Sequence, residues 1–395
     1  MVSEINQTPK ALRLHIGVFG RTNAGKSTLI NAISGHKTAL TSPVAGTTTD
    51  PVYKPMELLP LGPVVFIDTA GLDDKSELGE IRVKKTMQQL TTCDAAILVI
   101  SAKTTDFSEE LKYISEIKKE GIPMLIVVNT FGDKNLSSEI YKQFGCKVIM
   151  LDIENGGIQL LKDAVIELLN DRIEEPALTA NLVKKGDLVI LTAPQDIQAP
   201  KGRLILPEVH VLRDLLDNGC MVMTVTSENI KRAFESLAVK PALVVTDSQI
   251  FKLVNETIPA DIPLTSFSLL MAKIKADISK LVKGAQAIDD LENGDRVMIL
   301  ESCSHHPLDG DIAREKIPRW LKLYTGKELQ IVNYSGQIIP EKLQGYKLAI
   351  HCGGCMVNRK SMLYKQKQFA DAGVPLTNFG AAIAYMNGIL NRVTY

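Results

Sequence analysis

The sequence predicts an α/β protein that folds as three consecutive α/β units with mostly parallel sheets. Short runs rich in Val, Ile and Leu alternate with longer amphipathic stretches along the chain, which is the pattern of strands joined by covering helices. The alternation is interrupted twice, by a polar, Pro-containing stretch over residues 171–178 and by a long helix-like stretch over Ser268–Ile288. Such breaks separate domains, so we expect units at residues 1–173, 180–266 and 267–395.

Strands are expected where β-branched runs are bounded by polar or glycine residues, and helices where apolar residues recur with a period near 3.6. In the first unit this predicts strands at Leu14–Phe19, Val64–Ile67, Ala95–Ile100, Met124–Val128 and Lys147–Leu151. Helices are expected between them at Lys26–Ile33, Glu80–Leu90, Ser108–Lys119 and Gly157–Asn170. The later units have expected strands at Leu188–Thr192, Met221–Thr226, Ala242–Thr246, Ile262–Ser266, Arg296–Leu300, Leu329–Asn333, Lys347–His351 and Val374–Asn378.

Charge and hydropathy exclude several classes of function. The chain has 45 basic and 45 acidic side chains among 395 residues, so it has no basic excess that would favour nucleic acid. Its apolar runs are too short to cross a bilayer, and residues 1–10 lack the apolar core of a signal peptide. Six cysteines make no disulfide framework in a chain of this length. We expect a cytoplasmic protein that binds neither nucleic acid nor a membrane.

The first expected strand leads directly into a phosphate-binding sequence. Residues 20–27 read Gly-Arg-Thr-Asn-Ala-Gly-Lys-Ser, the motif G-x-x-x-x-G-K-S between a strand and a helix. Backbone N–H groups at the helix N-terminus would surround phosphate oxygens. In this chemistry Lys26, the candidate catalytic lysine, reaches the β- and γ-phosphates and Ser27 binds Mg²⁺. The candidate nucleotide-binding residues are Asn23, Ala24, Gly25, Lys26, Ser27 and Thr28.

Two further segments fit a nucleotide switch. Asp68-Thr69-Ala70-Gly71 follows the strand Val64–Ile67, where Asp68 would hold the Mg²⁺ water shell and the Gly71 N–H would face the γ-phosphate. The polar stretch 46–50 lies between the two motifs and suits a switch loop. In this order the segments resemble those of the translation-factor-like GTPases, most closely the tRNA-modification GTPase branch.

That resemblance implies roles for single residues. Thr48 takes the place of the switch threonine that binds Mg²⁺, and Asn23 that of the asparagine that helps coordinate K⁺. Leu72 stands where other GTPases have a water-orienting glutamine, and Glu80, twelve residues after Asp68, matches the catalytic glutamate of the tRNA-modification branch. A glutamate is equally typical of any helix start, so both interpretations of Glu80 stay open. The resemblance implies a K⁺-stimulated GTPase with a low intrinsic rate.

The segment that would recognise guanine departs from the pattern of this branch. Such GTPases use Asn-Lys-x-Asp after a strand, whereas here Met124–Val128 is followed by Asn129-Thr130-Phe131-Gly132-Asp133. The lysine is replaced by Thr130, and the aspartate is displaced by one position, to Asp133. We keep Asn129 and Asp133 as base-binding residues and expect weaker nucleotide affinity than in relatives with the intact motif.

Cysteines and histidines gather after two strands of the third unit. Arg296–Leu300 is followed by Glu301-Ser302-Cys303-Ser304-His305-His306, and Lys347–Ile350 by His351-Cys352-Gly353-Gly354-Cys355. The carboxyl ends of parallel strands share one edge of a sheet, so the two groups can converge. Three thiolates and a histidine suit tetrahedral zinc or an iron–sulfur cluster, and Cys-x-x-Cys alone suits a redox pair. Spacing does not choose between zinc and iron.

A P-loop GTPase followed by Cys-x-His and, roughly 45 residues later, His-Cys-x-x-Cys resembles the FeFe-hydrogenase maturation GTPases, the HydF family, over the whole chain. The resemblance implies a GTPase domain at residues 1–173, a dimerisation domain at 180–266 and an iron–sulfur cluster domain at 267–395. It implies a 4Fe–4S cluster held by Cys303, Cys352 and Cys355. His305 and His351 are then candidates for the fourth ligand or for hydrogen bonds near it.

The same resemblance implies a scaffold and carrier that binds GTP or GDP with Mg²⁺ and K⁺. A homodimer would receive a transient diiron precursor from radical-SAM hydrogenase maturases and deliver it to apo FeFe-hydrogenase. An alternative of another class is a tRNA-modification or ribosome-associated GTPase with a structural zinc site. A third is a plain regulatory GTPase without bound metal. Iron with acid-labile sulfide would favour the first, and copurified RNA the second.

Overall fold

The computed structural model divides the chain into two compact units, residues 1–174 and 175–395. Each unit has its own sheets and cores and is described by itself. Among the described residues no helix is long and apolar enough to cross a membrane. The structure describes residues 12–34, 52–69, 71–73, 86–133, 138–170, 177–194, 204–302, 311–336, 339–340, 342–354 and 357–395.

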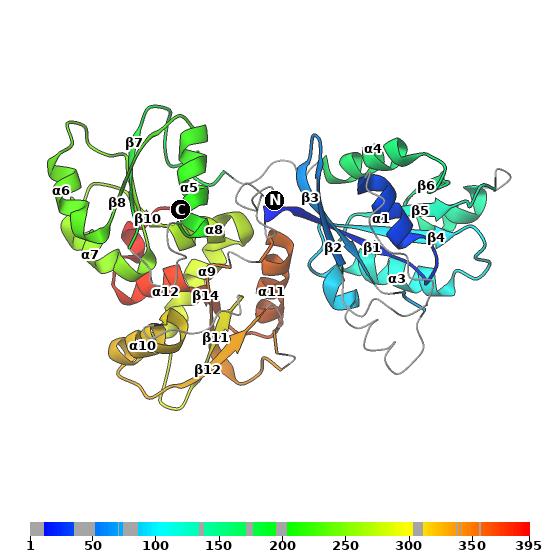
Figure 1. Ribbon diagram of the computed structural model, residues 1–395. Coiled ribbons are helices and arrows are strands. Elements are labelled where there is room, and N and C mark those ends of the chain that lie inside the picture. The colour runs from blue at the N-terminus through cyan, green and yellow to red at the C-terminus, as the bar shows by residue number, and fades with distance from the viewer. Residues whose placement is uncertain are drawn as a thin grey trace. The chain divides into compact units, whose positions relative to one another are not determined.

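The first unit contains a six-stranded sheet in the order β2-β3-β1-β4-β5-β6, which confirms the α/β fold class (Figure 1). Every pair is parallel except β2 with β3. Strand β2 was not expected, because Pro55 and polar residues interrupt its sequence; an edge strand tolerates such a proline. The strands are β1 (Leu14–Phe19), β2 (Val52–Leu58), β3 (Gly62–Asp68), β4 (Ala95–Ser101), β5 (Met124–Asn129) and β6 (Lys147–Leu151).

Helices cover both faces of this sheet, as a parallel sheet requires. Helices α1 (Lys26–Ser34) and α4 (Ile158–Leu169) pack on one face, and α3 (Ser108–Lys119) on the other. Successive strand residues alternate between the two cores, so that Phe66 joins the first and Ile67 the second. A strand buried on both faces therefore reads as a continuous apolar run, as the sequence of this unit does.

The second unit contains two four-stranded parallel sheets, in the orders β10-β9-β7-β8 and β12-β11-β13-β14. If the strands of each sheet are numbered along the chain, both orders read 2-1-3-4. The first sheet comprises β7 (Leu188–Thr192), β8 (Met221–Val225), β9 (Leu243–Thr246) and β10 (Leu264–Ser266). The second comprises β11 (Arg296–Glu301), β12 (Gln330–Ser335), β13 (Tyr346–His351) and β14 (Leu376–Asn378).

The long helix expected over Ser268–Ile288 is in fact two helices, so that expectation was wrong. Ala276 is extended, and the Asp277 side chain accepts a hydrogen bond from the Lys280 N–H, which caps a new helix. The helices of this unit are α5 (Leu206–Asp217), α6 (Ile230–Glu235), α7 (Phe251–Thr257), α8 (Phe267–Lys275), α9 (Ile278–Ala285), α10 (Ile317–Thr325), α11 (Arg359–Asp371) and α12 (Phe379–Met386).

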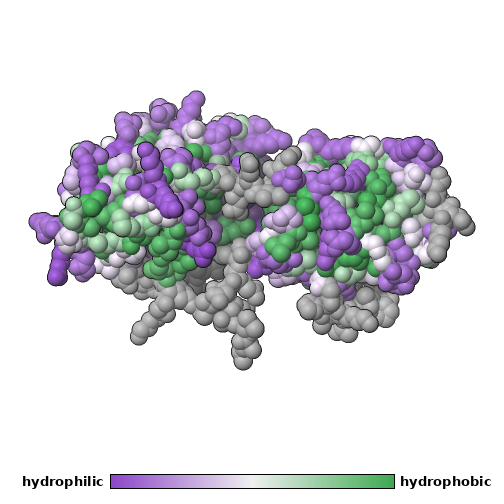
Figure 2. Space-filling view, turned by 90° about the horizontal axis from the view of Figure 1, so that it is seen from above, coloured by the Kyte–Doolittle hydropathy of each residue, from purple (hydrophilic) through white to green (hydrophobic). Residues whose placement is uncertain are grey.

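One hydrophobic core joins the two sheets of the second unit. It contains residues of both sheets, for example Val244 and Ile299, together with residues of α7, α9, α10 and α12. The C-terminal residues also return to the first sheet, because Val393 forms a parallel bridge with Leu264. In the view of Figure 2 hydrophilic side chains cover much of each unit, with hydrophobic patches between them.

Candidate functional site

The phosphate-binding loop adopts conformations that only certain residues allow. Gly20, Asn23 and Gly25 have φ values of +145°, +61° and +105°, a positive range that glycine adopts readily and that asparagine tolerates near +60°. A Cβ on Gly20 would lie 2.3 Å from the Val99 carbonyl oxygen, and one on Gly25 2.7 Å from Asn129 Nδ2. The loop therefore needs glycine at both positions, as its motif predicts.

Lys26 lies inside this loop. Its side chain is buried, and Nζ donates to the carbonyl oxygens of Gly20 at 3.0 Å and Arg21 at 2.8 Å. Burial lowers the pKa of Lys26, while the charge of Asp68 acts in the opposite direction. The loop thus holds the ammonium group where the motif requires it to meet phosphate oxygens.

Ser27 and Asp68 form the candidate Mg²⁺ site. Ser27 Oγ donates to Asp68 Oδ2 at 2.6 Å, and Asp68 Oδ1 is buried without a hydrogen-bond partner among the described residues. Burial raises the pKa of Asp68, and the hydrogen bond from Ser27 and the charge of Lys26 partly counteract it. A buried carboxylate oxygen without a partner needs a cation or ordered water. These hard oxygen ligands fit Mg²⁺.

Asp73 belongs to the same site, although the sequence argument did not select it. Its Oδ1 accepts hydrogen bonds from the Thr22 backbone N–H at 2.7 Å and from Thr22 Oγ1 at 2.8 Å. Burial raises the pKa of Asp73, but the bonds from Thr22 prevail and lower it overall. Gly71 packs so closely that a Cβ would lie 2.2 Å from Thr22 Oγ1. An acidic residue two positions after the glycine of the Asp-x-x-Gly segment was the available signal.

Asn129 binds the phosphate loop rather than solvent. It is buried, and its Nδ2 donates to the Ala24 carbonyl oxygen at 3.3 Å. The extra residue in the base-recognition loop is accommodated by positive φ values at Phe131 (+49°) and Gly132 (+85°). Asp133 is exposed, and its N–H closes the turn on the Thr130 carbonyl oxygen at 3.1 Å. The two expected base-binding residues therefore lie at the two ends of one short segment that starts at the end of β5. Asn129 uses its amide to hold the P-loop.

Asn23 is exposed at the tip of the P-loop, and the next residues along the loop, from Ala24 to Thr28, continue into α1. Thr48 and Glu80 lie outside the described residues. The positions of the switch threonine and of the candidate catalytic glutamate therefore stay predictions from the sequence.

The described residues of the two cysteine segments, among them Ser302 and Cys352, lie together at the carboxyl ends of β11 and β13. The two strands are adjacent, with Leu300 paired to His351. The Ser302 backbone N–H donates to Cys352 Sγ at 3.3 Å. Ser302 directly precedes Cys303 in the chain, and Gly354, with φ of +64°, directly precedes Cys355. Cys303, His305 and Cys355 themselves lie outside the described residues.

His351 has partners for both ring nitrogens within the protein. The side chain is 1% exposed. Nδ1 lies 2.7 Å from the Cys352 carbonyl oxygen, which makes Nδ1 the donor, and Nε2 lies 3.1 Å from Ser302 Oγ and 3.4 Å from Lys365 Nζ. This arrangement suits a residue that supports the cysteines through hydrogen bonds more than one that ligates metal.

The surroundings of Cys352 favour its thiolate form. Burial raises the pKa of Cys352, but the neighbouring His351 and the N–H groups of Ser302 and Gly354 outweigh burial and lower the pKa to about 6. The thiolate is the form that binds metal, so this donor set fits a metal or iron–sulfur cluster. Among the described residues no group of three metal-ligating side chains comes together; Cys303 and Cys355 lie outside them.

Comparisons with known proteins identify the family. Residues 178–276 match the hydrogen maturase F dimerization domain and residues 279–395 the hydrogen maturase F tetramerization domain, while residues 15–130 match the 50S ribosome-binding GTPase family. The chain belongs to the hydrogen maturase F family. The family expected from the P-loop and the two cysteine segments is confirmed.

The GTPase relatives match the N-terminal part of this hydrogen maturase F chain. GTPase Der of Campylobacter hominis is 29% identical over 160 residues, covering 40% of this chain and 35% of that protein. The tRNA modification GTPase MnmE of Pelagibacter ubique is 36% identical over 126 residues, covering 32% of this chain and 28% of that protein. The N-terminal unit is a GTPase domain that binds GTP or GDP with Mg²⁺. The chain spans about a third of the length of these relatives.

Among solved structures, a probable GTP-binding protein engB matches with a TM-score of 0.33 and 19% identity, over 40% of this chain and all of that one.

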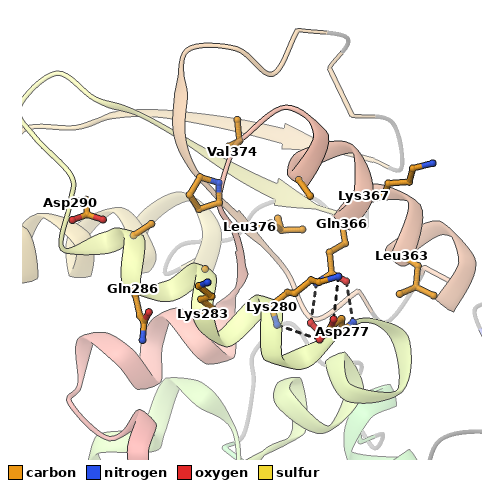
Figure 3. A pocket seen from close by; sticks show the side chains of 14 residues that line it. Asp277, Lys280, Lys283, Gln286, Asp290, Leu363, Gln366, Lys367, Val374 and Leu376 are labelled. Atoms are coloured by element: carbon orange, nitrogen blue, oxygen red, sulfur yellow. Dashed lines mark hydrogen bonds and ion pairs between the residues drawn. The ribbon is translucent and has the colours of Figure 1, made fainter.

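A surface pocket of about 700 Å³ lies apart from the cysteine edge, between α9, α11 and β14 (Figure 3). Its lining contains no cysteine or histidine. Gln366 joins the two helices across it, because Oε1 accepts from the Asp277 N–H at 3.0 Å and Nε2 donates to the Asp277 carbonyl oxygen at 2.9 Å. The pocket is not the candidate metal centre of this hydrogen maturase F chain.

Proposed function

We propose that the chain is a GTP-hydrolysing scaffold that binds a 4Fe–4S cluster and carries a diiron precursor to apo FeFe-hydrogenase. The observation that carries the proposal is the hydrogen bond from the Ser302 N–H to Cys352 Sγ. It joins Ser302, the residue directly before Cys303 in the chain, to Cys352 on the neighbouring segment. Membership of the hydrogen maturase F family supports a role of the protein in hydrogenase maturation.

The GTPase unit supplies a nucleotide switch. Lys26 stabilises the charge on the β- and γ-phosphates, and Ser27 with Asp68 holds Mg²⁺. We assign K⁺ coordination to Asn23, Mg²⁺ coordination in the GTP state to Thr48, and activation of the attacking water to Glu80. Loss of the γ-phosphate releases such switch segments, so hydrolysis would control partner association or release.

The third expected unit supplies the cluster site. Cys303, Cys352 and Cys355 would hold the cluster, whose open iron position gives an attachment point for the diiron cargo. The Ser302 N–H stabilises the Cys352 thiolate. Gly354 has a positive φ and lets the chain turn directly before Cys355. Hydrogen bonds to sulfur are among the features that tune such clusters.

The matched domains, which are named for dimerization and tetramerization, support an oligomeric protein. We propose that the homodimer forms through the unit around β7–β10, within the matched residues 178–276. The partners would be radical-SAM hydrogenase maturases, which provide the diiron precursor, and apo FeFe-hydrogenase, which receives it. The protein would act in the cytoplasm.

The test is metal analysis of anaerobically purified protein with its absorption and EPR spectra. Wild type is expected to contain about four irons and four sulfides per chain, and Cys303→Ser to lose most of both. Cys146→Ser, in the GTPase unit, is the matched control and keeps its iron. About one zinc without sulfide would contradict the proposal and favour an RNA-linked GTPase. No metal in wild type would favour a plain regulatory GTPase.

A further inference from the structure

A buried lysine lies beside the cysteine edge of the second sheet of the C-terminal unit. Lys365 on α11 is 3% exposed, and its Nζ lies 3.4 Å from His351 Nε2. No carboxylate among the described residues forms an ion pair with it. An ammonium group buried without a counter-ion is costly, so this position calls for an anionic neighbour.

The cysteine segment can provide that neighbour. Cys352 directly follows His351, the residue that Lys365 Nζ contacts, so the thiol belongs to the same turn as the imidazole. A second buried lysine, Lys275 on α8, donates from Nζ to the Gly354 carbonyl oxygen at 2.6 Å. Two helices thus direct amines at the turn over residues 351–354. The positive charges of these two buried amines favour anionic thiolates at the same turn.

We propose that Lys365 is a positioning residue that raises the reduction potential of the cluster bound by Cys303, Cys352 and Cys355. The inference rests on the proposed function. A cluster with three thiolate ligands becomes more negative when it accepts one electron from a reductant such as dithionite. A positive charge fixed nearby in a buried setting stabilises that reduced form more than the oxidised one.

His351 links the lysine to the cluster site. Its ring stands between Lys365 Nζ and the Cys352 carbonyl oxygen, and Ser302 Oγ holds the same Nε2. Lys365 therefore fixes the ring orientation as well as adding charge. A residue that only held the ring in place would leave the potential unchanged when replaced by a polar side chain of similar length.

The experiment compares midpoint potentials in the full chain after anaerobic cluster reconstitution. Lys365→Met and Lys365→Gln remove the charge, and Lys365→Arg keeps it. Lys367→Met is the matched control, since Lys367 is exposed on the same helix at the rim of the pocket in Figure 3. An EPR-monitored dithionite titration should show more negative potentials for Met and Gln, and wild-type potentials for Arg and for the control.

Equal potentials in wild type and Lys365→Gln, at equal iron content, would overturn this inference while leaving the proposed function intact. So would an equal shift in Lys367→Met, because the effect would then be one of overall charge. A wild-type chain that binds no iron contradicts the proposed function, and the inference with it. If Lys365→Met fails to fold, Lys365→Gln alone decides the outcome.

Discussion

The two four-stranded sheets of the second unit share their backbone plan and differ in their chemistry. Both have the order 2-1-3-4, and both end in a strand followed by a helix, with sequences Leu-Thr-Ser-Phe at 264–267 and Leu-Thr-Asn-Phe at 376–379. In each, the residue after the third strand donates to a residue at the end of the first strand, the last one in the first sheet and the last but one in the second. The bonds are Asp247 N to Thr192 O at 3.3 Å and Cys352 N to Leu300 O at 2.8 Å.

The equivalent residues then serve different purposes. Asp247 Oδ1 accepts from the Gln249 N–H at 2.8 Å and so caps a short 3₁₀ turn. Cys352 Sγ instead accepts from Ser302, across to the neighbouring strand. The fold places two segments at the carboxyl edge in both sheets, but only those of the second sheet contain cysteines. This fold therefore provides the position of a site, and single residues provide its chemistry.

The first prediction replaces Cys352 of the second sheet by aspartate, the residue that the first sheet has at the equivalent position, and the effect should be large. Cys352→Asp should lose most of its iron, because a thiolate ligand is replaced, while GTP hydrolysis persists in the separate N-terminal unit. Asp247→Cys should leave wild-type iron content unchanged and should not restore iron to Cys352→Asp. Iron and sulfide assays with a GTPase assay measure both. Normal iron in Cys352→Asp would show that this edge is not the site.

The second prediction concerns a contact between the two halves of the second unit, each of which consists of one four-stranded sheet and its helices. Ser268 and Gly380 occupy equivalent positions, each one residue after the matching sequences given above. A Cβ on Gly380 would lie 2.2 Å from Ser268 Oγ. Gly380→Ser should lower the free energy of unfolding by about 1–3 kcal/mol through overpacking. Urea unfolding can follow this through Trp320, the single tryptophan of the chain, which lies on α10 in the same unit.

The matched control is the exchange of both residues. Ser268→Gly combined with Gly380→Ser exchanges the serine and the glycine between the two halves. The contact again contains one hydroxymethyl group, so most of the lost stability should return. If the double variant is as unstable as Gly380→Ser, the two positions are not equivalent, and the comparison of the halves fails at this contact.

The sequence was informative where chemistry requires particular residues in order. The P-loop, its flanking strand and helix, and the edge holding Cys352 followed from motif and strand alternation. Helix breaks and edge strands did not, because Asp277 caps α9 within an uninterrupted amphipathic pattern and Pro55 lies in β2. Lys365 could not be found, since a lysine on an amphipathic helix looks exposed until tertiary packing buries it.

The third prediction tests the helix starts that follow the last strand of each sheet. Ser266 Oγ accepts from the Leu269 N–H at 3.3 Å, and Asn378 Oδ1 from the Ala381 N–H at 2.8 Å. Each alanine variant should cost about 1 kcal/mol of unfolding free energy, and Asn378→Ala more than Ser266→Ala because its bond is shorter. Asn378→Ser keeps a capping oxygen without adding a buried charge and is the control. An equal loss in Asn378→Ser would show that the cap is not the cause of the effect.

The smallest effect is expected at the threonines that precede these caps. Thr265 and Thr377 are both fully buried, and in neither does the hydroxyl have a hydrogen-bond partner among the described residues. Thr265→Val and Thr377→Val should each raise the free energy of unfolding by roughly 0.5 kcal/mol, because a methyl group replaces a buried hydroxyl that gains nothing. Urea unfolding of the two variants should give the same sign and similar size. A loss at one position alone would mean that its hydroxyl has a partner in solution, and that the two halves differ inside the sheet as well as at its edge.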